Sequence, residues 1–174
     1  IQLNQSSVSL CIGETITLTA TISPETTTDK TIKWSSSDKS IASVDNNGKI
    51  TAIAIGSTTI TAQVGNIKAS CAVAVKPIEV TSIELNQTSA SIIIGESINL
   101  TATVYPENAT DKTITWSSSK TSVATVVGGK VTAIAEGNAT ITAQIGNIKA
   151  QCLITVNPVE VSSITLSQTS ITLF

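Results

Sequence analysis

Residues 15–22 read Thr-Ile-Thr-Leu-Thr-Ala-Thr-Ile, with an apolar side chain at every even position and threonine at every odd position. Successive side chains of a β-strand point to opposite faces, so this pattern predicts a strand with one buried face and one exposed face. Similar alternation occurs in residues 8–12, 32–34, 60–62 and 71–75. Turn-forming residues separate these runs, and no helical spacing of apolar residues persists. We therefore predict an all-β fold.

The chain also repeats itself. Residues 1–25, IQLNQSSVSLCIGETITLTATISPE, match residues 83–107, IELNQTSASIIIGESINLTATVYPE, at a spacing of 82. The turn Asp-Asn-Asn-Gly-Lys at 45–49 becomes Val-Gly-Gly-Lys at 127–130, one residue shorter. Residues 164–174 match the opening of each copy once more. The repeat predicts two whole units and the start of a third.

We accordingly divide the chain into a first domain at residues 1–76 and a second at 77–157. Residues 158–174 are assigned to the first strand of a truncated third repeat. Each copy holds about seven short strands in about 80 residues, which is typical of a sandwich of two sheets. A parallel sheet would need crossover helices, and the sequence predicts none.

Longer motifs recur in both copies, among them LTATxxPE, TIxWSSS, GKxTAI and TITAxxGNIKAxC. With the Gly-Glu pairs at 13–14 and 95–96, they make essentially the whole chain resemble the bacterial immunoglobulin-like (Ig-like) domains, group 2. The resemblance implies a β-sandwich found in tandem arrays on bacterial surface proteins, adhesins and secreted enzymes. It therefore implies an extracellular location, on the bacterial cell surface or secreted. It implies no single biochemical activity, because one fold serves many functions.

Trp34 and Trp116 occupy equivalent positions in the two copies. Each tryptophan shares its strand face with an isoleucine two residues earlier, which predicts that it packs in the core between the sheets. An exposed platform that stacks against sugar rings is the alternative. Few other aromatic residues are present to complete such a platform, since aromatic residues make up 2% of the chain.

The three cysteines differ in their pattern. Cys71 and Cys152 are equivalent and share a strand face with apolar neighbours, so we expect both thiols in the cores. Cys11 has no counterpart and falls out of phase with the leucine and isoleucine beside it. We expect Cys11 to be an exposed thiol. A Cys11–Cys71 disulfide would join an outward and an inward side chain, which disulfide geometry disfavours unless a bulge intervenes.

Catalysis and cofactor binding have little support in the sequence. The chain contains no histidine, the usual general base near neutral pH, and we expect no cofactor and no metal. Residues 45–48, Asp-Asn-Asn-Gly, resemble a calcium ligand run but are first of all a hairpin turn. A calcium site at a domain junction, with Glu79 or Glu160, stays open as an alternative.

Charge and hydropathy exclude two classes of partner. The net charge is −2 and no cluster of lysine or arginine occurs, so we expect no binding to nucleic acid. No apolar run is long enough to insert this segment into a membrane as a helix.

The function favoured by these patterns is a non-catalytic spacer with a role in adhesion. The connectors at 75–82 and 156–163 each contain proline and no glycine, which predicts short and rather stiff joints between repeats. The expected partners are neighbouring Ig-like repeats of the same chain. Two alternatives stay open: a module that binds a host surface protein or glycan, and an accessory domain of a secreted polysaccharide-degrading enzyme.

Overall fold

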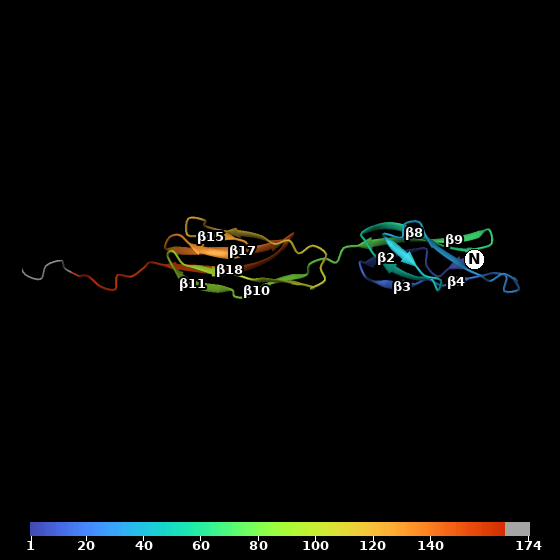
Figure 1. The fold of residues 1–174 in the computed structure, drawn as a ribbon, viewed down its shortest axis with the longest axis horizontal. Helices are drawn as coiled ribbons and strands as arrows, with labels where there is room; N and C mark the ends of the chain where they lie inside the picture. The colour runs from blue at the N-terminus through green and yellow to red at the C-terminus, as the bar shows by residue number, and fades with distance from the viewer. Residues whose placement is uncertain (166–174) are drawn as a thin grey trace, which may run out of the picture. The chain divides into compact units, whose positions relative to one another are not determined.

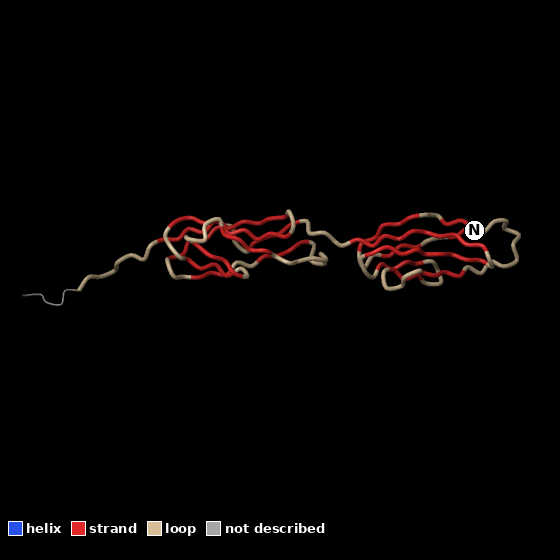
Figure 2. The backbone as a smooth tube through the Cα atoms, turned by 90° about the horizontal axis from the view of Figure 1, so that it is seen from above, coloured by secondary structure: helices blue, strands red, loops and turns tan. Residues whose placement is uncertain are grey.

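A computed structural model describes residues 1–165. The regular secondary structure of these residues consists of strands alone, so the all-β prediction is confirmed (Figures 1 and 2). Residues 1–165 accordingly contain no helix that could cross a membrane. The described residues form two compact units, of which the first is Ile1–Glu79 and the second begins at Val80. The division falls three residues beyond the boundary expected between residues 76 and 77.

Both units contain the same sequence of strands. In unit 1 they are β1 (Gln2–Leu3), β2 (Ser7–Cys11), β3 (Thr15–Thr17), β4 (Ala20–Thr21), β5 (Lys33–Ser36), β6 (Ala42–Val44), β7 (Lys49–Ala52), β8 (Gly56–Val64) and β9 (Ile67–Lys76). In unit 2 they are β10 (Ser82–Leu85), β11 (Ser89–Ile93), β12 (Ser97–Asn99), β13 (Ala102–Tyr105), β14 (Thr115–Ser118), β15 (Ala124–Val127), β16 (Lys130–Ala133), β17 (Gly137–Ile145) and β18 (Ile148–Asn157).

Two layers of strands make up each unit (Figure 1). One layer of unit 1 has the order β2-β9-β8-β5, and the other has the order β3-β7-β6 with the short pair β1-β4 beside it. Unit 2 repeats this arrangement as β11-β18-β17-β14, β12-β16-β15 and β10-β13. The first two strands of each unit are both broken in two, so nine segments trace seven strands, in agreement with the sandwich prediction.

An asparagine holds the first strand where it leaves one sheet for the other. The Asn4 side chain accepts a hydrogen bond from the Thr19 amide at 2.9 Å, and the Asn4 amide donates to the Thr19 carbonyl at 3.0 Å. Asn86 makes the same two bonds with Thr101, both 3.0 Å long. This repeated Leu-Asn-Gln motif thus fixes the break between β1 and β2 and between β10 and β11.

The second half of the first strand pairs with the last strand of its own unit. β2 runs parallel to β9, with Ser7 opposite Ala72 and Cys11 opposite Lys76. β11 likewise runs parallel to β18 over five residue pairs. All other ladders are antiparallel. The first and last strands of each unit therefore lie side by side and point the same way.

Each unit has a dry interior of its own. The buried cluster of unit 1 consists of Leu10, Leu18, Ala42, Ile50, Ala52, Ile60, Cys71, Val73 and Val75. Unit 2 has a corresponding cluster that includes Ile92, Leu100, Val131, Ile141, Cys152 and Ile154, and a second one at its N-terminal end. The alternation in the sequence supplies these side chains, since every second residue of a strand faces the interior.

Residues 158–165 carry no strand. The third-repeat strand predicted for residues 158–174 is therefore absent from the part that the structure describes. The rest of that prediction falls on residues 166–174, which lie outside the described residues.

Candidate functional site

Both cysteines expected in the cores are fully buried. Cys71 and Cys152 are each 0% exposed. Their thiols donate to the backbone carbonyls of Ala72 and Leu153 at 3.6 and 3.9 Å, which are weak contacts at most. Burial raises the pKa of both thiols, because removal from water disfavours the thiolate. These positions offer packing and no activated nucleophile.

Trp34 and Trp116 are partly buried and pack against the core of their own unit. The Trp34 ring lies against Gly48, at the end of the turn between β6 and β7. Part of Trp34 also lines an open hollow of about 420 Å³, together with Leu18, Thr19, Ala20, Lys30, Ile32, Asn46 and Asn47. The tryptophans therefore pack against the cores, and Trp34 also lines a surface depression.

Cys11, for which the sequence predicts an exposed thiol, lies at the end of β2 and is partly buried. Its amide donates to the Glu14 carboxylate at 2.7 Å. Cys11 lies opposite Lys76 in the parallel ladder, five residues along β9 from Cys71. At about 3.3 Å per residue that separation far exceeds the reach of a disulfide. Cys11, Cys71 and Cys152 are all free.

Acidic residues of the repeat act as backbone acceptors. Glu14 bonds the amide of Cys11, and Glu96 bonds the amide of Ile93 at 3.1 Å, so each carboxylate closes the turn that follows the first strand. The carboxylate of Asp45 accepts from the amides of Asn47 and Lys49 at 2.8 and 2.9 Å. The run at 45–48 is thus organised as a turn.

Among residues 1–165, no group of three or more acidic, cysteine or histidine side chains is placed to hold a metal ion. Glu79 and Glu160, considered for a calcium site at a junction, belong to no such group in this part of the chain.

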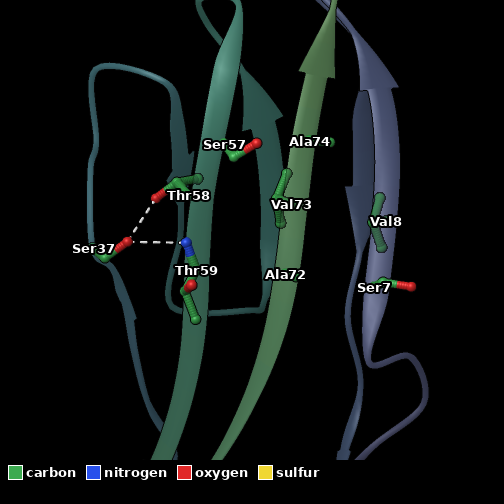
Figure 3. Close-up of a pocket in the computed structure, with 9 residues that line it drawn as sticks. All are labelled: Ser7, Val8, Ser37, Ser57, Thr58, Thr59, Ala72, Val73 and Ala74. Atoms are coloured by element: carbon green, nitrogen blue, oxygen red, sulfur yellow. Dashed lines mark hydrogen bonds between the residues drawn. The ribbon is translucent and has the colours of Figure 1, made fainter.

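A hollow of about 310 Å³ lies on the four-stranded sheet of unit 1 (Figure 3). Its lining comes from β2, β8, β9 and the residue after β5, and consists of Ser7, Val8, Ser37, Ser57, Thr58, Thr59, Ala72, Val73 and Ala74. Small side chains line it throughout, and this lining contains no ionisable side chain. Such a surface can make van der Waals contacts and neutral hydrogen bonds.

Thr58 is the centre of the hydrogen bonds beneath this hollow, and it is 6% exposed. Its hydroxyl lies 3.1 Å from the Ser36 hydroxyl. It also lies 3.0 Å from the Ser37 hydroxyl (Figure 3). It also accepts from the Asp38 amide at 2.9 Å. Ser36 in turn donates to the Ala42 carbonyl at 2.7 Å, so the network ties β5 to β6 and β8.

No buried side-chain nitrogen or oxygen within the described residues lacks a partner. The hydroxyls around Thr58 are thus engaged in structure, and none of them lies beside a histidine base, because the chain has none.

Sequence reasoning missed this network, although a signal for it exists. Thr58 shares its strand face with Ile60 and Ala62, so alternation places its hydroxyl inside. Unit 2 has Ala139 at that position and Leu153 where unit 1 has Ala72. Unit 2 therefore lacks the central hydroxyl of this network and has a larger side chain at the position of the hollow.

The profile of the bacterial Ig-like domain (group 2) family matches residues 1–74 and 79–155. The chain belongs to the bacterial Ig-like domain (group 2) family. This confirms the resemblance drawn from the repeated motifs. The two matched stretches also agree with the two sandwiches, so each unit is one bacterial Ig-like domain.

Several proteins resemble this Ig-like chain. An uncharacterized protein of Clostridium acetobutylicum is 37% identical over 159 residues, which cover 87% of this chain and 16% of that protein. An Ig-like virion protein of Serratia phage KSP90 is 34% identical over 155 residues, or 84% of this chain and 60% of that protein. An alpha-L-arabinofuranosidase of Bifidobacterium longum is 48% identical over 71 residues, or 39% of this chain and 7% of that enzyme.

Among solved structures, domains 1–6 of the surface layer protein SbsC match 75% of this chain and 20% of that chain, with 21% identity and a TM-score of 0.47. The Ig-like chain spans 16% and 60% of the first two relatives, so it matches less than two thirds of either protein.

Proposed function

We propose that this chain is a non-catalytic spacer that carries tension between the segments at its two ends, as part of a bacterial extracellular protein. The observation that supports this role is the parallel pairing of the first and last strands in each unit. β2 pairs with β9 and β11 pairs with β18, each over five residues.

This pairing determines how tension acts on a unit. Tension pulls β2 towards the N-terminus and β9 towards the C-terminus, which are opposite directions along two parallel strands. All hydrogen bonds of the ladder are then loaded together in shear. Further bonds extend the ladder at both ends, from the Ala72 amide to the Ser6 carbonyl at 2.9 Å and from the Ile12 amide to the Lys76 carbonyl at 3.2 Å. The same direction of pull would open an antiparallel hairpin one bond at a time.

The connector suits a spacer as well. Lys76 ends β9, and Pro77 follows it in a segment without glycine. Proline restricts the backbone and removes an amide donor, which limits the freedom of a joint. Ile78 and Val80 add apolar side chains to this short segment. We infer that neighbouring repeats are the main partners of each unit.

Single-molecule pulling tests the role of the parallel ladder. Handles on Ile1 and Lys76 load β2 against β9 in shear, whereas handles on Cys11 and Lys76 load the same ladder at one end, because these two residues are opposite each other. The free thiol of Cys11 provides the second attachment point. We expect a several-fold higher rupture force for the first geometry. Equal forces in both geometries would contradict the proposal.

The relatives support an extracellular location, on the cell surface or secreted, and this location is part of the proposal. Their names include a virion protein and an arabinofuranosidase, both of which contain a stretch similar to this chain. Localisation of the full-length parent protein by fractionation of the host cell, followed by surface proteolysis, tests it. Recovery of the protein only from the cytosol would contradict the proposal.

One observation favours a second candidate, a module that binds a host protein or a glycan, or that assists a polysaccharide-degrading enzyme. The hollow over Thr58 is lined by small side chains, and unit 2 has the larger Leu153 at the position of Ala72. A screen against glycans and matrix proteins tests this candidate, with Ala72→Leu as the matched control that fills the hollow. Binding that survives Ala72→Leu would not involve this surface.

A further inference from the structure

The hollow beside Trp34 is a separate place on unit 1 from the hollow over Thr58, and the two share no lining residue. It has a volume of about 420 Å³. This volume falls within the range of small-molecule sites, about 300–1,000 Å³. Its walls come from the break between β3 and β4, the loop that leads into β5, β5 itself and the turn between β6 and β7. The lining residues are Leu18, Thr19, Ala20, Lys30, Ile32, Trp34, Asn46 and Asn47.

Hydrogen bonds within unit 1 hold the walls of this hollow in place. The Leu18 amide donates to the Gly48 carbonyl at 2.9 Å, which ties the break between β3 and β4 to the turn. The Asp45 carboxylate holds the turn itself by accepting from two backbone amides. In the loop before β5, the Thr31 amide donates to the Asp29 carboxylate at 2.9 Å. A ligand therefore meets walls that need little further ordering, which lowers the entropic cost of binding.

The polar side chains of the lining are available to a ligand. Thr19, Lys30, Asn46 and Asn47 are all exposed. Within residues 1–165, no hydrogen bond or ion pair engages the Lys30 ammonium or the side-chain amides of Asn46 and Asn47. Lys30 is the one ionisable side chain of this lining, so the hollow presents a positive charge and no negative one.

Unit 2 repeats the frame of this hollow but not its asparagines. Leucine, threonine, alanine, lysine, isoleucine and tryptophan recur at the equivalent positions, which are Leu100, Thr101, Ala102, Lys112, Ile114 and Trp116. The two asparagines fall where the turn of unit 2 is one residue shorter, and Gly128 stands in their place. The amide side chains therefore distinguish unit 1 from unit 2 at a place where the surrounding residues are the same.

We propose that the hollow beside Trp34 is a subsite for one acidic sugar residue, a uronate, of a polysaccharide. Trp34 and Ile32 contact the apolar C–H face of the sugar ring. The amides of Asn46 and Asn47 each supply a donor and an acceptor to its hydroxyls. The Lys30 ammonium pairs with the carboxylate, which selects a uronate over a neutral sugar. This site goes beyond the spacer role, which assigns no ligand, and does not depend on it.

Fluorine NMR of the chain labelled with 5-fluorotryptophan tests the proposal, because each unit contains one tryptophan. Methyl β-D-glucuronide is the probe, and methyl β-D-glucoside is the control that has the same ring without the charge. We expect the glucuronide to shift the Trp34 resonance saturably and to leave the Trp116 resonance in place. The glucoside should bind about fivefold more weakly. Equal affinities, equal shifts of both resonances or no saturable shift would overturn the proposal.

An exchange of turns between the units tests the asparagines. Residues 45–48 are replaced by Val-Gly-Gly, the sequence of residues 127–129, and a second chain receives the reciprocal exchange. Both turns join equivalent strands, so each suits the other unit. We expect the first exchange to remove the glucuronide shift from Trp34 and the second to produce one at Trp116. A glucuronide shift of Trp34 that survives the first exchange would overturn the proposal.

A matched pair of lysine substitutions tests the charge. Lys30→Gln should make the glucuronide and the glucoside bind alike, because it removes the cation from the lining. Lys112→Gln is the control in unit 2 and should leave the preference at Trp34 unchanged. Both lysines are exposed, so neither substitution removes a side chain from a core. A preference for the glucuronide that persists in Lys30→Gln, or that disappears in Lys112→Gln, would overturn the assignment.

Discussion

Single contacts explain why particular residues recur in both units. A side chain at Gly48 would place its Cβ 2.4 Å from the Leu18 carbonyl and 2.8 Å from the Trp34 ring. Gly129 approaches Leu100 and Trp116 in the same way. Both glycines have positive φ, +80° and +88°. Glycine at this point of the turn therefore allows the tryptophan to close the core.

Gly48→Ala should destabilise unit 1 strongly, because it combines an unfavourable φ with a collision against backbone. We expect a loss of about 2–4 kcal/mol in the free energy of unfolding. Gly65→Ala is the matched control, since Gly65 has φ +56° but nothing within 4 Å of the added Cβ. We expect a loss of about 1 kcal/mol there. Urea denaturation measures both, and similar losses would contradict the role assigned to the close approach.

The thiols should differ sharply in reactivity. Burial raises the pKa of Cys71 and Cys152 and closes off their access to reagents, whereas Cys11 is only partly buried. Ellman's reagent at pH 8 should therefore modify one thiol in the native chain and all three after unfolding. Cys11→Ser should abolish the native reaction. Rapid modification of a second thiol without unfolding would show that a core is open.

Alternation of residues accounts for much of what the sequence could predict at this scale. It placed Cys71 and Cys152 on the inner face, and both are 0% exposed. Alternation did not predict how exposed Trp34 and Cys11 are, and both side chains are partly buried. These residues lie near the ends of their strands, where neighbouring loops decide solvent access. Alternation places the Thr58 hydroxyl on the inner face, but its partners could not be predicted because they lie 20 to 22 residues away in the sequence.

Strands and turns form the next scale, where hydrogen bonds set the register. The turn at 45–48 is held by the Asp45 carboxylate, which accepts from two amides. Unit 2 connects the equivalent strands through Gly128 and Gly129, both with positive φ, and needs no such carboxylate. Two different turns thus join equivalent strands, a longer one in unit 1 and the two glycines in unit 2, which is why the repeat tolerates a one-residue change in length here.

Asp45→Ala should therefore cost about 1 kcal/mol of stability in unit 1, because two backbone amides lose an acceptor. Asp45→Asn keeps one side-chain oxygen, and we expect a smaller loss. Thermal unfolding with and without calcium chloride tests both variants beside the parent chain. A calcium-dependent rise in the Tm of the parent that both substitutions remove would contradict the interpretation of this run as a turn.

Acid should weaken the loop that follows β13 in unit 2. Hydrogen bonds from Thr113 lower the pKa of the Asp111 carboxyl from its ordinary value of 3.8. Because its pKa is lower in the folded state, the Asp111 carboxylate contributes its full stabilisation of the fold above the unfolded-state pKa. This stabilisation is lost as the pH falls through the folded-state pKa. We expect a small drop in Tm below about pH 4 that Asp111→Asn reduces. An unchanged acid profile in Asp111→Asn would contradict this assignment.

Most strands could be predicted from the sequence, but their partners could not. The pattern of residues 1–12 indicates a strand and does not show that β1 and β2 belong to different sheets. The Asn4 bonds to Thr19 produce this break, and they depend on a contact 15 residues away. The parallel pairing of β2 with β9 likewise involves residues more than 60 positions apart.

At the scale of the whole molecule, internal repetition was the most informative feature of the sequence. It predicted two sandwiches, and the family match to residues 1–74 and 79–155 confirms both. Unit 1 ends at Glu79 and unit 2 begins at Val80, whose side chain packs against the buried cluster at the N-terminal end of unit 2. Alternation of polar and apolar residues predicts strands only, so it could not predict that a connector residue packs against a core.

The central claim is that each repeat folds around its own core. Urea titration of the 5-fluorotryptophan chain tests it directly, because Trp34 reports unit 1 and Trp116 reports unit 2. We predict that Gly48→Ala lowers the midpoint of the Trp34 resonance alone and that Gly129→Ala lowers that of Trp116 alone. A joint shift of both resonances in either variant would show one merged folding unit and contradict the account.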